Sequence, residues 1–103
     1  MKTISEKIEN TKYIFDNKID LKIDSTINLE HFIKQLQSIG YERVTFVIES
    51  GQFASRGDII DIFTDKPYRI EFFDDTIENI REFNISSQKS IKKVHTIEIY
   101  PIN

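Results

Sequence analysis

The chain has 103 residues, of which 39% are hydrophobic, and this is enough apolar material for one domain with a single modest core. The net charge of -3 is the wrong sign for a domain whose main task is to hold a phosphate backbone, so direct nucleic-acid binding is disfavoured. The absence of cysteine excludes a disulfide framework and a cysteine nucleophile, and no apolar run is long enough for a secretion signal or a membrane span, so we expect a soluble, cytoplasmic protein.

Residues 1–18 form a lead-in segment. Its apolar residues recur at loosely helical spacing, which predicts a short N-terminal helix: Ile4, Ile8 and Phe15. From Ile19 the pattern changes, because apolar and charged residues alternate as they do in a strand with one solvent-facing side. We expect the core of the domain to span residues 19–101, within a single domain of residues 1–103.

The segment DSTINLEHFIKQLQSIGYER contains the clearest predicted helix. Its apolar residues fall on one stripe: Leu29, Phe32, Ile33, Leu36 and Ile39. Asn28 is placed to cap the first turn, and Gly40 is placed to end the helix in a left-handed conformation. His31 lies off the stripe, so we expect it to be exposed.

Short segments rich in Ile, Val, Phe and Tyr follow the helix and predict strands: Val44–Ile48, Gln52–Arg56, Ile59–Phe63, Tyr68–Phe73, Ile80–Phe83 and Val94–Tyr100. Glycines and acidic pairs separate them at hairpin-like distances, so consecutive strands should be antiparallel neighbours. The polar segment Ser86–Lys93 is expected to be a surface loop or helical turn. The predicted fold class is α+β, an antiparallel sheet of about five to six short strands packed with one main helix and a short helical lead-in.

The strand YRIEFF sorts its side chains by parity. One set predicts a side facing the core: Tyr68, Ile70 and Phe72. The other set, Arg69, Glu71 and Phe73, combines a cation, an anion and an aromatic ring, which is a poor core and a typical protein interface. The alternative is a stray surface phenylalanine over which Arg69 packs its stem. Arg69 and Glu71 are too far apart along one strand for a tight mutual salt bridge, so we expect them to meet a partner's charges.

Arg56 precedes Gly57 at a predicted strand end, where the hairpin brings it towards the same region of the sheet. The alternative is an arginine that belongs to a turn. Asp61 has apolar neighbours of the same parity, which predicts a half-buried carboxylate. We expect this carboxylate to accept hydrogen bonds or to pair with a nearby arginine, in a structural and not a catalytic role.

Several motifs that suggest other functions lack their context. Arg56, Gly57 and Asp58 spell an adhesion triplet, which needs an extracellular loop, and two SxxK matches lack the companion motifs of that chemistry. Phosphate-binding loops, the nucleophile elbow and the zinc-protease helix motif are absent. His31 and His95 are the only imidazoles and fall on different elements, so we expect no catalytic residue, no metal and no cofactor.

The segments GYER, GQFASRGDIIDIF, PYRIEFFDDTIENIREF and SSQKS occur in this order along the chain. Together they resemble, over Leu29–Pro101, the second domain of the UvrB-like module of the bacterial transcription-repair coupling factors, the Mfd family. The UvrA-interacting domain of UvrB is similar in part, but Phe73–Ile77 and Ser87–Ser90 match the Mfd pattern more closely. Thr64 stands where both families usually have proline, a difference that affects the geometry of a loop.

The resemblance implies an adaptor domain, part of a larger multidomain ATP-dependent DNA translocase, that recruits the ATPase UvrA to stalled RNA polymerase for nucleotide excision repair. Arg56, Arg69 and Phe73 match family positions associated with UvrA contact, and Glu71 matches an acidic interface position. The resemblance also implies that a C-terminal domain of the parent protein covers this surface until polymerase is engaged. We expect a monomer with no membrane or direct nucleic-acid contact.

Three alternatives remain at this point. They are the equivalent UvrA-binding domain of UvrB, a nucleic-acid-binding module, and a spacer that packs only against its own parent chain. The adaptor hypothesis predicts that Arg56→Ala and Arg69→Ala each weaken UvrA binding with little change in melting temperature.

Overall fold

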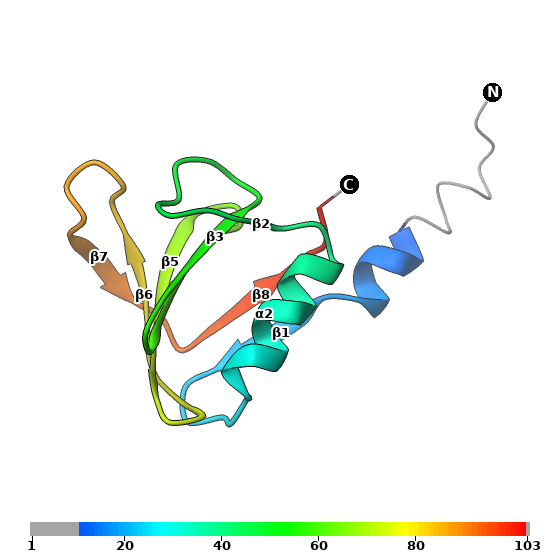
Figure 1. The fold of residues 1–103 in the computed structure, drawn as a ribbon, viewed down its shortest axis with the longest axis horizontal. Coiled ribbons are helices and arrows are strands. Elements are labelled where there is room, and N and C mark those ends of the chain that lie inside the picture. The colour runs from blue at the N-terminus through cyan, green and yellow to red at the C-terminus, as the bar shows by residue number, and fades with distance from the viewer. Residues whose placement is uncertain (1–10, 103) are drawn as a thin grey trace.

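The computed structural model describes residues 11–102, and within them the chain forms two layers (Figure 1). The elements are β1 Ile19–Lys22, α2 Leu29–Ser38, β2 Glu42–Arg43, β3 Gln52–Arg56, β4 Ile59–Phe63, β5 Pro67–Phe73, β6 Thr76–Phe83, β7 Ser90–Lys93 and β8 Thr96–Ile99. One layer is a six-stranded sheet in the order β2-β3-β4-β5-β6-β7, and the second holds α2 and the β1-β8 ribbon. The predicted α+β class is confirmed.

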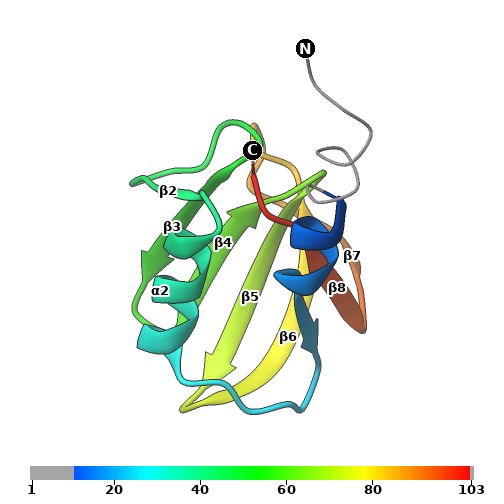
Figure 2. The same ribbon diagram turned by 90° about the vertical axis from the view of Figure 1, so that its right-hand side faces the viewer.

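Figure 2 looks onto the side of the sheet that α2 and the β1-β8 ribbon cover. We call this covered side the inner face and the opposite side the outer face. The main core lies between the inner face and the covering layer, and its fully buried side chains come from both: Leu21, Phe32, Leu36, Phe53, Ile60, Ile62, Ile70, Ile77, Ile80 and Ile99. Inward isoleucines from three neighbouring strands form one cross-strand row, Ile60, Ile70 and Ile80.

Both ends of α2 follow the sequence signals. The Asn28 side chain accepts a hydrogen bond of 3.0 Å from the backbone N–H of His31, which satisfies a donor that the first turn leaves free. Gly40 has a φ of +102°, and a Cβ at this position would lie 2.8 Å from the carbonyl oxygen of Ile102. Glycine is therefore required here for its backbone conformation and for the close approach of the C-terminal segment.

The prediction of a strand over Val44–Ile48 is wrong. The sheet holds only Glu42 and Arg43 of this region, as β2, which runs parallel to β3. The following residues leave the sheet as a loop whose backbone N–H groups find other acceptors, including the side chain of Gln52. The segment is rich in Val, Phe and Ile, as strands are, but only Val44 and Val47 pack against the fold, while Phe46 and Ile48 are exposed.

Ser86–Lys93 was expected to be a loop or a helical turn, and this is wrong for its second half. Ser90–Lys93 forms β7, which pairs with β6 in antiparallel register. All four residues of β7 are exposed, so they carry none of the apolar alternation by which a strand is recognised in a sequence.

The lead-in segment is helical over residues 11–16 where the structure describes it. Phe15 is 58% exposed, and its ring meets the Tyr100 ring edge-on with 6.3 Å between centroids. Ile4 and Ile8, which carried the rest of this prediction, lie outside the described residues. Across residues 11–102, the structure holds no helix of the length and apolarity that a membrane crossing requires.

Replacement of Phe32 should show how strongly the core depends on the helix. Phe32 is fully buried and its ring centroid lies 6.4 Å from that of Phe72, so Phe32→Ala leaves a cavity between the helix and the sheet. We expect a loss of about 3 to 5 kcal/mol in the free energy of unfolding, measured by urea denaturation. The control is Lys34→Ala on the exposed side of α2, for which we expect a change within about 0.5 kcal/mol. Equal midpoints for the two variants would contradict this account of the core.

Candidate protein-binding surface

The register of the sheet gathers charged side chains on the outer face. One row of residues crosses five strands, each opposite the next: Ala54, Asp61, Arg69, Arg81 and Lys93. A second row beside it runs through Arg56, Ile59, Glu71 and Asn79. Since residues directly opposite share one side of a sheet, these side chains occupy one face although they come from distant parts of the chain.

A buried carboxylate lies at the centre of this face. The Asp61 side chain is 3% exposed and accepts two hydrogen bonds from Arg69, with Nε 2.7 Å from Oδ1 and Nη2 2.9 Å from Oδ2. Arg56 adds a third, from Nη2 to Oδ2 at 3.1 Å. The expectation that Asp61 pairs with a nearby arginine is confirmed. Asp61 binds two of the predicted site residues, Arg56 and Arg69. Such charge-assisted, two-pronged pairs are the stronger kind of hydrogen bond in proteins.

Arg69 is held by two further contacts. Its Nη2 donates to the side-chain oxygen of Gln88 at 2.8 Å, and its guanidinium carbon lies 4.4 Å from the centre of the Phe83 ring. The hydrogen bond to Asp61 raises the pKa of Arg69 above its ordinary value, so the group stays charged. With 21% of the side chain exposed, Arg69 is fixed in one orientation and still reaches the surface.

Glu71 pairs with a cation on the neighbouring strand β6 and not with Arg69 on β5. Arg81 Nε lies 3.5 Å from Glu71 Oε1, and each side chain is 34% exposed. This agrees with the expectation that Arg69 and Glu71 are too far apart to pair. Arg81, Phe83 and Gln88 were not singled out from the sequence, because their place beside β5 depends on strand pairings that contain a bulge.

Phe73 lies at the end of β5, next to the turn into β6, and is 69% exposed. Arg56 is 41% exposed at the end of β3, close to the turn at the same end of the sheet. The four predicted site residues therefore divide into an ordered pair of arginines on Asp61, a glutamate paired with Arg81, and a free aromatic ring.

The centre of the outer face differs in charge from the chain as a whole. Its two cross-strand rows hold four cations and two carboxylates, so they carry +2 where the whole chain carries -3. The cations are Arg56, Arg69, Arg81 and Lys93, and the carboxylates are Asp61 and Glu71. A surface of this sign attracts an acidic partner.

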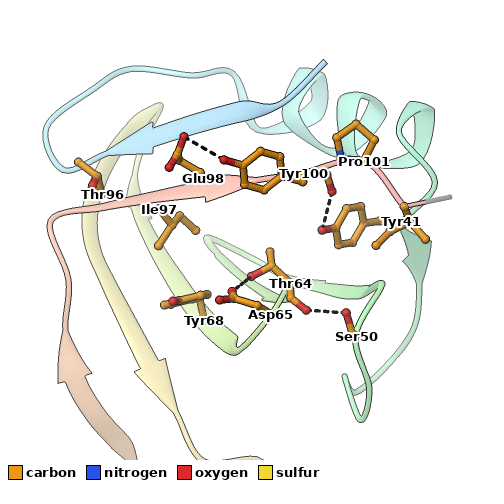
Figure 3. A pocket seen from close by; sticks show the side chains of 11 residues that line it. Tyr41, Ser50, Thr64, Asp65, Tyr68, Thr96, Ile97, Glu98, Tyr100 and Pro101 are labelled. Atoms are coloured by element: carbon orange, nitrogen blue, oxygen red, sulfur yellow. Dashed lines mark hydrogen bonds between the residues drawn. The ribbon is translucent and has the colours of Figure 1, made fainter. Parts of the chain in front are cut away.

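A separate hollow of about 570 Å³ lies away from these residues, between the β4-β5 turn and β8 (Figure 3). Tyr41 donates a hydrogen bond of 3.0 Å across its wall to the carbonyl oxygen of Tyr100, and Ser50 donates to the carbonyl oxygen of Thr64. The first bond ties the C-terminal segment to the rest of the fold, and the second ties the residue before Gly51 to the β4-β5 turn. Within residues 11–102, no three His, Asp or Glu side chains are grouped to hold a metal ion.

Comparison with known proteins identifies the family. A family model described as the UvrB interaction domain matches residues 19–103. The chain belongs to the UvrB interaction domain family. The match covers all eight strands and α2, and it begins at Ile19, the first residue of β1.

Similar relatives of this UvrB interaction domain carry the name transcription-repair-coupling factor. The protein of that name from Escherichia coli (strain K12) is 30% identical over 102 residues, which cover 96% of this chain and 9% of the relative. The protein from Staphylococcus aureus (strain USA300) is 36% identical over 86 residues, 82% of this chain and 7% of the relative. The resemblance to the coupling factors is confirmed, and the chain spans less than a tenth of the length of these relatives.

Removal of the Asp61 charge should loosen the outer face. We expect Asp61→Asn to lower the free energy of unfolding by about 2 kcal/mol, because two guanidinium groups then lose their common counter-charge. Urea denaturation measures this loss. Asp65→Asn is the matched control, because Asp65 is exposed and accepts a hydrogen bond from the Thr64 hydroxyl. Equal stability of the two variants would show that the outer-face cluster adds nothing to the fold.

Tyr41 should make the fold sensitive to alkali. Burial, with a smaller effect from the Asp65 charge, raises the pKa of Tyr41 from 10.0 to about 12. The folded state therefore favours the neutral phenol, and this stability is complete below pH 10 and disappears as the pH rises to about 12, a loss of the order of 2 kcal/mol.

Alkaline titration of phenolate absorbance, with urea denaturation at matching pH, tests this assignment. Tyr41→Phe should remove the late-titrating group and flatten the fall in stability between pH 10 and 12. Tyr13→Phe, at an exposed position, should keep the late-titrating group and the fall in stability between pH 10 and 12, although one phenol fewer then contributes to the absorbance. A late titration that persists in Tyr41→Phe would assign it to another tyrosine.

Proposed function

We propose that this domain is an adaptor that recruits UvrA to stalled RNA polymerase for nucleotide excision repair. The observation that carries the proposal is the outer face, on which Arg56 and Arg69 are oriented by Asp61 and Phe73 stands exposed at the end of the same strand as Arg69. The residues that the family resemblance associates with UvrA contact are thus gathered on one side of the sheet.

Pre-ordering of the arginines favours tight binding. Arg56 contacts Asp61 through Nη2, and Arg69 contacts it through Nε and Nη2, so each guanidinium keeps further N–H donors for a partner's carboxylates. Because Asp61 already fixes their orientation, binding costs less side-chain entropy than it does for free arginines. Phe73 adds an aromatic anchor, and Arg and aromatic residues are the usual hot spots of protein interfaces.

The proposal includes the setting of the domain. In this proposal the parent is a cytoplasmic, ATP-dependent DNA translocase whose C-terminal domain covers the outer face until polymerase is engaged. The domain itself is a monomeric interaction module with no catalytic step, no cofactor and no direct contact with nucleic acid or membrane. The ordered arginine pair on the outer face supports a role of this kind.

The equivalent domain of UvrB is the main alternative, and it has the same partner. The names of the similar relatives favour the coupling factors. The positive charge on the outer face is also compatible with nucleic-acid binding. That function is distinguished from UvrA binding by an affinity for DNA that falls steeply as the salt concentration rises.

Binding to purified UvrA, measured by titration calorimetry, tests the proposal. Arg56→Ala and Phe73→Ala should each weaken binding by about tenfold to thirtyfold, the effect of losing about 1.4 to 2 kcal/mol at a hot spot. Both side chains are well exposed, so we expect little change in melting temperature. Arg69→Ala should weaken binding and also lower the melting temperature, since it removes two of the three arginine hydrogen bonds to the buried Asp61 whereas Arg56→Ala removes one, and this revises the expectation from the sequence.

The controls lie on the opposite side of the molecule. Tyr13→Ala removes an exposed aromatic ring from the N-terminal helix, and Lys34→Ala removes an exposed cation from α2. Both should bind UvrA as the unaltered domain does. Wild-type affinity for Arg56→Ala and Phe73→Ala, or salt-dependent DNA binding without UvrA binding, would refute the adaptor function.

A further inference from the structure

Residues 44–51, the 44–51 loop, connect β2 to β3 and curl towards the outer face at one end of the sheet (Figure 1). Phe46 is 66% exposed and Ile48 is 68% exposed, although both are large apolar side chains. Between them Val47 is buried, with 4% of its surface exposed. The loop therefore turns one side chain inward and displays its two neighbours.

The 44–51 loop is held in place at several points. The side-chain oxygen of Gln52 accepts hydrogen bonds from the backbone N–H groups of Ile48, at 2.9 Å, and Glu49, at 3.2 Å. At the two ends of the loop, Val44 donates to the carbonyl oxygen of Phe53 and Gly51 donates to that of Phe63. Gln52 itself is 8% exposed, so water has little access to these bonds. The exposed side chains thus stand on an ordered backbone.

The anchor of the loop also joins it to the arginine cluster. Val47 packs with Ala54 and Phe83 in a small second core, and Ala54 lies directly opposite Asp61 in the sheet. Phe83 is the ring over which the Arg69 guanidinium lies. The same residues that bury Val47 therefore border the side chains that carry the proposed function.

We propose that Phe46 and Ile48 are a second, apolar half of the docking surface and bind the same protein partner as the arginines. This inference rests on the proposed function. The partner then presents an apolar patch beside its carboxylates, so that one surface of the partner meets the 44–51 loop, the arginine pair and Phe73 in turn.

Two considerations favour this occupant. A stable interface covers about 800 Å² on each partner, which is more than two arginines, a glutamate and one phenylalanine supply, so the contact must extend over neighbouring residues. Because the backbone of the loop is already held by hydrogen bonds, binding through Phe46 and Ile48 costs less loop-ordering entropy than binding through a flexible segment. Val47 packs with Phe83, over which Arg69 lies, so the loop that carries Phe46 and Ile48 is continuous with the arginine pair.

The experiment compares variants of the domain in titration calorimetry with purified UvrA. Phe46→Ser combined with Ile48→Ser should weaken binding about tenfold or more, with an unchanged melting temperature because both side chains are exposed. Tyr13→Ser is the matched control, an exposed aromatic position on the far side of the molecule.

A second variant tests the role of loop order. Gln52→Ala removes the acceptor of two loop N–H groups without removing an exposed side chain. Hydrogen exchange at the amides of Ile48 and Glu49 should accelerate, and UvrA affinity should fall even though Gln52 is buried. Faster exchange with unchanged affinity would overturn the inference.

The outcomes separate this inference from the adaptor function. If Arg56→Ala loses affinity while the Phe46 and Ile48 double variant keeps it, the loop is not part of the interface and the adaptor function stands. If neither variant loses affinity, the adaptor function fails and this inference fails with it. A double variant that changes the self-association of the domain in sedimentation, with UvrA affinity intact, would assign the loop to a second copy of the chain and overturn the inference.

Discussion

The carboxylate of Asp61 organises the outer face. It lies in the middle of β4 with 3% of its side chain exposed, where an ionised group without partners would be strongly unfavourable. Arg56 from β3 and Arg69 from β5 neutralise this charge by donating hydrogen bonds to the Asp61 carboxylate from the two neighbouring strands. One buried negative charge therefore determines where two positive charges point, and Phe83 and Gln88 complete the cage around the second of them.

The two faces of the sheet differ in composition, since one is apolar and the other is largely charged. The inner face is apolar, and its isoleucines pack against α2 and the β1-β8 ribbon to supply the hydrophobic free energy of the fold. The outer face keeps a small apolar core at one end, around Val47, Ala54 and Phe83, and leaves its centre to charged groups. Because the larger apolar core lies on the inner face, the outer face is able to present arginines and exposed aromatic rings.

The sequence predicted the features that depend on local spacing. The helix stripe, the Asn28 cap and the alternation along β5 are set by residues a few positions apart, and all three are present. The pairing of Arg81 with Glu71 and the contact of Arg69 with Gln88 depend on strand register across the β5-β6 and β6-β7 hairpins. Bulges in both hairpins shift that register by amounts that no spacing rule supplies. The 44–51 loop escaped prediction because its Val, Phe and Ile content is typical of a strand, whereas its path depends on hydrogen bonds to Gln52 and on the packing of Val47.

The β1-β8 ribbon has a mechanical consequence. Ile19, where β1 begins, lies opposite Ile99, where β8 ends, so the chain enters and leaves this antiparallel ribbon at the same end. Tension applied to the start of β1 and the end of β8 breaks their hydrogen bonds one pair after another, since these bonds run perpendicular to the strands. Peeling of this kind needs less force than sliding two strands past each other, so the ribbon is the part of the covering layer that separates most easily from the inner face.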